Sequence, residues 1–162
     1  MEEKSHMVAV TGIVVKEGKY LITKRNFQKK AFPGKWTVPG GGLEVTDYIN
    51  DAPDTEGKHW YNIVEKVLRR EIKEETGLDI KNIGYVTSLV YIRQDEIPCL
   101  IISLYAEPEQ GEIKLCDALT EYKWIDLQEA KNYELIEGIY EELVILDDFL
   151  KKGRNMNWKK LE

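Results

Sequence analysis

Apolar and polar positions alternate in short blocks at the start of the chain. Residues 8–15 (VAVTGIVV) are a β-branched, apolar run, which is the pattern of a buried strand. A polar turn at residues 16–19 precedes residues 20–25 (YLITKR), which we expect to return as the second strand of a hairpin. Gly and Pro then dominate residues 33–42, where we expect neither helix nor strand.

The middle of the chain carries the clearest helical pattern. Residues 46–59 are polar and contain Pro53 and Gly57, so they predict a long loop. Apolar residues recur at helical spacing over residues 60–76, and Gly77 supplies a C-terminal stop.

The remaining chain predicts further strands and one closing helix. Strands are expected at residues 83–93, 99–106, 113–115 and 122–125, with a turn at residues 108–111. The closing helix is expected over residues 133–150, with an apolar stripe at Leu135, Ile139, Leu143 and Leu146. Strands on both sides of one helix, followed by a second helix, predict an α/β fold with a mixed sheet between helices.

Length and composition limit the classes of function. A chain of 162 residues fits a single domain, residues 1–162. Its net charge of −6 argues against a nucleic acid duplex or an anionic membrane as the partner. Two widely spaced cysteines and two histidines do not form a zinc motif. No signal peptide or membrane-spanning stretch is recognisable, so a cytoplasmic location is expected.

Three glutamates gather at the end of the predicted central helix. Glu71, Glu74 and Glu75 fall on the side of the helix that begins apolar, whereas an ordinary amphipathic helix places its glutamates opposite. They repel one another at i,i+3 and i,i+4 spacing, and the helix C-terminus disfavours anions. A hard divalent cation, Mg²⁺ or Mn²⁺, would offset these penalties. The alternative is a solvated acidic face neutralised by neighbouring basic residues.

Three consecutive glycines lie upstream of this helix. Gly40, Gly41 and Gly42 permit positive φ angles and a close approach of the backbone to a ligand. Their carbonyl groups can ligate a metal and their amides can meet phosphate oxygens. A purely structural turn is the alternative.

Together, the loop and the helix resemble the Nudix hydrolases. The signature of that family has a Gly, five residues, a Glu, seven residues, and then Arg-Glu-U-x-Glu-Glu-x-Gly-U, where U is a bulky aliphatic residue. The second half is matched here by Arg70, Glu71, Ile72, Glu74, Glu75, Gly77 and Leu78. The resemblance implies a Nudix-type α/β/α sandwich over nearly the whole chain.

The chain departs from the signature in its first half. Five residues after Gly41 stands Asp47, where the family has Glu, and Glu44 is an alternative for this acid. The 22 residues between Asp47 and Arg70 exceed the family's seven by 15, which places an inserted loop at residues 48–60. Many relatives carry a further metal-binding Glu where Ala118 stands, so Asp117 or Glu121 is a candidate for that role.

The resemblance implies a metal-dependent hydrolase that cleaves a pyrophosphate bond in a nucleoside triphosphate, a sugar nucleotide, ADP-ribose or a dinucleotide. The implied catalytic residues are Arg70, Glu71, Glu74 and Glu75. The implied metal ligands are Glu71, Glu74 and Glu75 with a carbonyl group of Gly40 or Gly41. Glu71 is expected to orient or deprotonate the attacking water.

Other residues are candidates for substrate binding, together with Gly41 and Gly42. Arg25 ends the second strand and is placed to reach a phosphate, or is a plain strand-end cation. Tyr91 and Arg93 alternate along one strand, so they are expected to share a face and line a base pocket, or to lie in the core or at an edge. Residues 59–61 are read as a lid or as a hydrophobic staple. Residues 151–162 are read as a tail.

Three alternative functions remain open from the sequence. The first is a Nudix-fold nucleotide sensor without hydrolysis, and the second is an isoprenoid diphosphate isomerase. The third is a partner-binding protein that uses an acidic face of the last helix, formed by Glu134, Glu137, Glu141 and Glu142. A homodimer is also open, because members of the family often pair.

Overall fold

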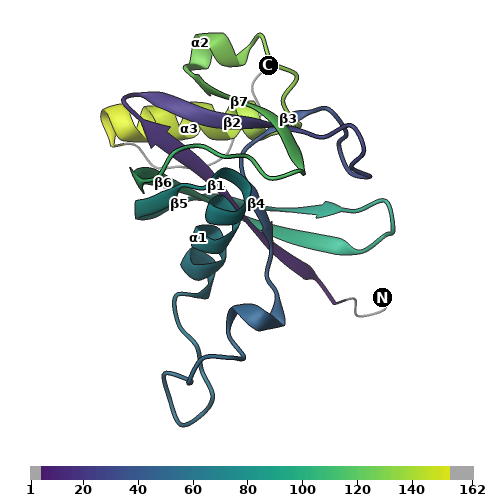
Figure 1. The fold of residues 1–162 in the computed structure, drawn as a ribbon, viewed down its shortest axis with the longest axis vertical. Helices are drawn as coiled ribbons and strands as arrows, with labels where there is room; N and C mark the ends of the chain where they lie inside the picture. Colours follow the sequence, from purple (N-terminus) through teal and green to yellow (C-terminus); the bar gives the residue numbers. More distant parts are fainter. Residues whose placement is uncertain (1–4, 154–162) are drawn as a thin grey trace.

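The computed structural model describes residues 5–153 (Figure 1). The strands are β1 (Met7–Lys16), β2 (Lys19–Arg25), β3 (Trp36–Thr37), β4 (Gly40–Gly42), β5 (Asp79–Ile92), β6 (Pro98–Gln110) and β7 (Leu119–Ile125). The helices are η1 (Val45–Asp47), a 3₁₀ turn, α1 (Ile63–Thr76), α2 (Leu127–Ala130) and α3 (Ile139–Lys152).

The strands form a mixed sheet, as predicted. Its order is β3-β2-β1-β6-β5, while β4 pairs with β1 and β7 pairs with β2. The long pair β1–β6 is parallel, with Thr11 opposite Ser103, and the other pairs are antiparallel. Alternate residues of β1 therefore point to opposite faces, and each face carries apolar side chains.

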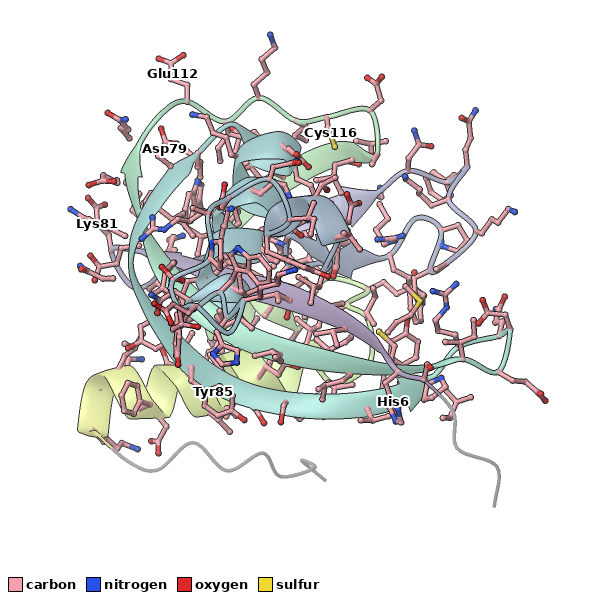
Figure 2. All side chains as sticks on the ribbon, turned by 90° about the horizontal axis from the view of Figure 1, so that it is seen from below. His6, Asp79, Lys81, Tyr85, Glu112 and Cys116 are labelled. Carbon is pink, nitrogen blue, oxygen red and sulfur yellow. The ribbon has the colours of Figure 1, made fainter. Side chains whose placement is uncertain are left out.

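The two long helices cover the two faces of this sheet (Figures 1 and 2). Under α1 lies a core of Val10, Val14, Leu21, Val67, Leu68, Ile72, Leu78, Ile80, Leu104 and Ala106. Under α3 lies a second core that includes Ile13, Tyr20, Ile22, Trp36, Val86, Leu143 and Leu146. This confirms the predicted α/β/α sandwich. Within residues 5–153, no helix is both apolar and long enough for a membrane crossing.

The expectation that residues 33–42 contain no strand was wrong. Trp36 and Thr37 pair with β2, and the three glycines pair with β1, with Gly41 opposite Val10. A Cβ atom on Gly40 would lie 2.7 Å from Thr11 Cα. Gly40 therefore approaches the neighbouring strand more closely than any side chain permits.

Both long helices begin later than their apolar patterns predict. Asn62 has a φ of 55°, so α1 starts at Ile63 rather than at residue 60. Gly138 has a φ of 92°, so α3 starts at Ile139 rather than at residue 133. The residues before α3 instead exchange backbone hydrogen bonds with Trp36: its amide donates to the carbonyl of Glu134, and the Ile136 amide donates to its carbonyl. Tertiary pairing overrides the helical pattern there.

Several strand boundaries also differ from expectation. β5 begins at Asp79, and β6 continues to Gln110 where a turn was expected, because Pro108 still pairs with Ile80. Residues 113–115 form no strand. The short helix α2, which was not predicted, is capped by Asp126, whose carboxylate accepts the amides of Gln128 and Glu129.

The inserted loop at residues 48–60 extends beyond the N-terminal end of α1 (Figure 1). The rings of Tyr48 and Trp60 pack with their centroids 5.4 Å apart, and the Trp60 indole donates to the Asp51 carbonyl at 3.1 Å. The Asp54 amide donates to the His59 carbonyl at 2.8 Å. Trp60 thus closes the inserted loop on itself. In the predicted tail, Lys151 and Lys152 belong to α3, and residues 154–162 lie outside the described part of the chain.

Candidate active site

Arg70, on α1, contacts two neighbouring segments that are distant from it in the sequence. Its Nε donates to Asp47 Oδ1 at 2.6 Å and its Nη2 to Asp47 Oδ2 at 3.1 Å. Nη2 also donates to the Gly42 carbonyl at 3.0 Å, and Nη1 donates to Glu71 at 2.7 Å and to Glu74 at 3.2 Å. A guanidinium group suits this task because its donors form a rigid planar fork. Arg70 therefore ties η1, the glycine strand and the end of α1 together.

Asp47, and not Glu44, is the acid that pairs with Arg70. Asp47 is buried, and hydrogen bonds from Arg70 hold the pKa of its carboxyl below the usual range. Its carboxylate also accepts the Glu44 amide at 2.8 Å. The side chain of Glu44 is exposed and contacts Thr46 instead. Of the two acids left open by the sequence, the one in register with the signature holds the arginine.

Glu71 packs directly against the glycine strand. A Cβ atom on Gly41 would overlap the Glu71 carboxylate, so any larger residue would force that side chain to move. Burial raises the pKa of Glu71, and repulsion from Glu74 adds to this, whereas Arg70 opposes it. The glycine and the glutamate of the signature therefore depend on each other sterically.

Glu75 is the more deeply buried carboxyl group of the cluster. Its Oε2 accepts the Gly40 amide at 3.0 Å. Burial raises the pKa of Glu75 to about 7, and repulsion from Glu71 contributes, while the charges of Arg25 and Lys29 lower it. Two basic side chains thus lie near this carboxyl group.

Glu74 points toward solvent, and its side chain is 59% exposed. Glu71 and Glu75 lie against the glycine strand, and Arg70 pairs with Glu74 beside them, so three carboxylates gather at this end of α1. A divalent cation would offset their negative charge. Within residues 5–153, no three acidic, His or Cys side chains converge as a compact set of metal ligands, and Arg70 engages two of these three glutamates. Carboxylate and glycine carbonyl oxygens are nevertheless the donor types that hard cations prefer, so the residues fit a hard divalent cation.

The predicted substrate-binding residues occupy different environments. Arg25 donates to the Ala31 carbonyl at 2.9 Å, and its charge acts on both Glu75 and Tyr91. Tyr91 lies in β5 with its ring 6.5 Å from that of Phe32. Arg93 lies beyond the end of β5 and pairs with Asp95 at 2.8 Å.

The two candidates for an additional acid differ in their contacts. Glu121 forms an ion pair with Lys24 at 2.8 Å across β7 and β2. Asp117 is exposed, and its backbone carbonyl accepts from the Asn26 side chain at 3.1 Å.

One buried acid was assigned wrongly from the sequence. Glu142 was placed on an exposed acidic face of the last helix, but it is 4% exposed and faces the sheet. Its spacing from the apolar stripe, three residues after Ile139 and next to Leu143, is the signal that identifies it as inward-facing.

The comparisons with known proteins agree with this geometry. The family model described as the NUDIX domain matches residues 5–144, so the chain belongs to the Nudix family. Its class of enzyme is that of the hydrolases that cleave pyrophosphate bonds. Divalent metals are used generally in that family. The chain is 26% identical over 136 residues to nucleoside triphosphatase NudI of Klebsiella pneumoniae, a match that covers 78% of this chain and 86% of that protein.

Solved structures share the fold. A MutT protein from Methanosarcina mazei superposes with a TM-score of 0.68 at 20% identity, covering 94% of this chain and 99% of that one. An ADP-ribose pyrophosphatase from Streptococcus suis superposes with a TM-score of 0.63 at 18% identity, covering 96% and 97%.

Proposed function

We propose that this protein hydrolyses the pyrophosphate bond of a small nucleotide, with nucleoside triphosphates as the first class to test. The observation that carries the proposal is the placement of Glu71 against Gly41 and of Glu75 against the Gly40 amide. This arrangement sets partly buried carboxylates beside a strand, β4, that carries no side chains. The sequence similarity to a nucleoside triphosphatase supports the choice of substrate class.

Each residue of the site has a task in this proposal. Glu74 and Glu75, with Glu71 and a carbonyl of Gly40 or Gly41, would hold Mg²⁺ or Mn²⁺. That ion, when bound, supplies positive charge to phosphate oxygens and makes a bound water more acidic. Glu71, held by Arg70, is positioned to orient the attacking water and to accept its proton.

The basic and aromatic residues around the site have separate tasks. Arg25, whose charge acts on Glu75, would stabilise negative charge on the phosphates, with the Gly41 and Gly42 amides as further donors. Tyr91, beside Phe32, offers an aromatic surface to the base. Arg93 is a weaker candidate, because Asp95 already neutralises it.

The proposed partner is a small molecule in the cytoplasm rather than a nucleic acid duplex, in keeping with the net charge of −6. The proposal is compatible with a homodimer. Gel filtration with light scattering measures the oligomeric state.

The function is tested with a substrate panel. Nucleoside triphosphates, sugar nucleotides, ADP-ribose and dinucleotides are incubated with Mg²⁺, Mn²⁺ or a chelator, and products are separated by chromatography. We expect a nucleoside monophosphate to appear only with metal. Absence of product from every compound, together with retained nucleotide binding, would instead favour a nucleotide sensor.

A further inference from the structure

Residues 24–35, which form the end of β2 and the connection to β3, gather positive charge in an acidic protein (Figure 1). This basic loop holds five Lys or Arg residues and no acid, whereas the whole chain has a net charge of −6. The cations at its two ends form ion pairs, Lys24 with Glu121 and Lys35 with Glu134. Among residues 5–153, no acid lies within ion-pair distance of the other three, which are Arg25, Lys29 and Lys30.

The basic loop is anchored beside the end of α1 that carries the glutamates. The Asn26 amide donates to the Ala118 carbonyl at 2.9 Å, and the Asn26 side chain donates to the Asp117 carbonyl at 3.1 Å. Just before these residues, the Cys116 amide donates to the Glu75 carbonyl at 3.1 Å. The start of the basic loop and the end of α1 are therefore fastened to the same short segment.

Arg25 and Lys29 lie on the side of the basic loop that borders the carboxylates. Their charges both act on the carboxyl group of Glu75. The Lys29 amide donates to the Asn26 carbonyl at 3.1 Å, and Arg25 Nε donates to the Ala31 carbonyl at 2.9 Å. These hydrogen bonds fix the backbone of the loop while the Lys29 ammonium stays exposed, so an anion can reach it without a large rearrangement.

A nucleoside triphosphate presents one more phosphate than the pyrophosphate bond requires. In the proposed hydrolysis, the metal ion and the glycine amides serve the phosphates on either side of the bond that is cut. The further phosphate needs cations of its own, because a terminal phosphate carries nearly two negative charges at neutral pH. In a sugar nucleotide or ADP-ribose, a neutral sugar takes this place.

We propose that Lys29, together with Arg25, binds the terminal phosphate of a nucleoside triphosphate and so selects it over substrates that end in a sugar. This rests on the proposed function, because the pyrophosphate bond must lie at the glutamates for the outer phosphate to reach the basic loop. Ammonium and guanidinium groups donate charge-assisted hydrogen bonds to phosphate oxygens, which are stronger than neutral ones.

ATP and ADP test the proposal with Mg²⁺, because they differ only in the terminal phosphate. We expect the wild type to favour ATP by about tenfold or more in kcat/KM. Lys29→Gln should remove most of this preference by raising KM for ATP, with kcat for ATP and both constants for ADP and ADP-ribose changed by about twofold or less. Lys29→Arg should keep the preference, because arginine supplies the same charge.

Lys30→Gln is the matched control, because it removes the same charge one residue away on the same exposed loop. It should leave the ratio of ATP to ADP unchanged. Equal losses in Lys29→Gln and Lys30→Gln would show a general attraction of anions and would overturn a specific contact. A wild-type enzyme that uses ADP or ADP-ribose as well as ATP would also overturn the proposal.

Calorimetric binding of α,β-methylene ATP and α,β-methylene ADP separates this proposal from the proposed hydrolysis, because the methylene group blocks cleavage between the first two phosphates. Tighter binding of the ATP analogue, lost in Lys29→Gln, supports recognition of the terminal phosphate even if no nucleotide is cleaved. Hydrolysis by a wild type that binds both analogues equally leaves the proposed function intact and overturns the assignment of Lys29.

Discussion

Arg70 and Asp47 form a two-point ion pair, with Nε 2.6 Å from Oδ1 and Nη2 3.1 Å from Oδ2. The two residues are separated by 22 others, most of which form the inserted loop. The pair therefore closes the two halves of the Nudix signature on each other despite the insertion. A shorter acid in place of glutamate still reaches the guanidinium, because η1 brings Asp47 beside α1.

Asp47→Asn should lower the free energy of unfolding by about 2 kcal/mol, because it leaves Arg70 without its buried counter-charge. Urea denaturation measures this. Asp51→Asn is the control, since the Asp51–Lys66 pair is exposed and contributes about 1 kcal/mol or less. Equal losses in both variants would show that the Asp47–Arg70 pair is no more important than a surface contact.

Gly41→Ala should destabilise the fold by about 1–3 kcal/mol, because the added methyl group overlaps the Glu71 carboxylate and forces it to move. Gly42→Ala is a matched substitution one residue away, where the nearest atom to the new Cβ is the Val8 carbonyl oxygen at 3.9 Å. Thermal unfolding of the two proteins should therefore separate them clearly. Similar melting temperatures would contradict the steric argument.

Glu74→Gln and Glu75→Gln should each reduce metal-dependent turnover on the order of a hundredfold or more, because each removes the charge of a proposed oxygen ligand. The fold should persist, since Glu74 is exposed and Glu75 is a carboxylate whose burial is unfavourable. Turnover is followed by product chromatography and folding by circular dichroism. If a variant with both substitutions keeps the wild-type rate of metal-dependent turnover, Glu74 and Glu75 are not the metal ligands.

Stability should depend on pH through Glu142. Burial raises the pKa of this group in the folded state, so the folded protein keeps the proton over a range in which the unfolded chain has lost it. The resulting stabilisation is complete below the unfolded pKa and is lost as pH rises through the folded pKa. Glu142→Gln should therefore gain stability relative to the wild type as pH rises, in urea titrations across this range. A parallel pH dependence in the two proteins would refute this.

Removing residues 48–62 leaves the seven residues between acid and arginine that the family uses. We expect kcat/KM of the same order of magnitude as in the wild type, because the inserted loop joins α1 at Ile63, roughly 18 Å along the helix from Glu75. Steady-state kinetics on the best substrate of the panel measures this. A large loss with an intact fold would instead assign the loop to the substrate site.

Much of the fold and the core of the site follow from local sequence. The β-branched run of β1, the helical pattern that ends at Gly77, and the apolar stripe of α3 each specify their element through periodicity alone. The carboxylate cluster was also recognisable, because its glutamates stand on the face of α1 that should be apolar. The matching residues of the signature then indicated the family.

Only the tertiary structure decided which distant residues meet. The choice of Asp47 over Glu44 depends on where η1 places each carboxylate relative to Arg70, which no local pattern encodes. The glycines became a strand because β1 lies beside them, and the partner of Glu142, Ser103, is supplied by a distant strand. Sequence periodicity reports the preferences of one segment, whereas pairing and burial depend on the partner segment that the fold supplies.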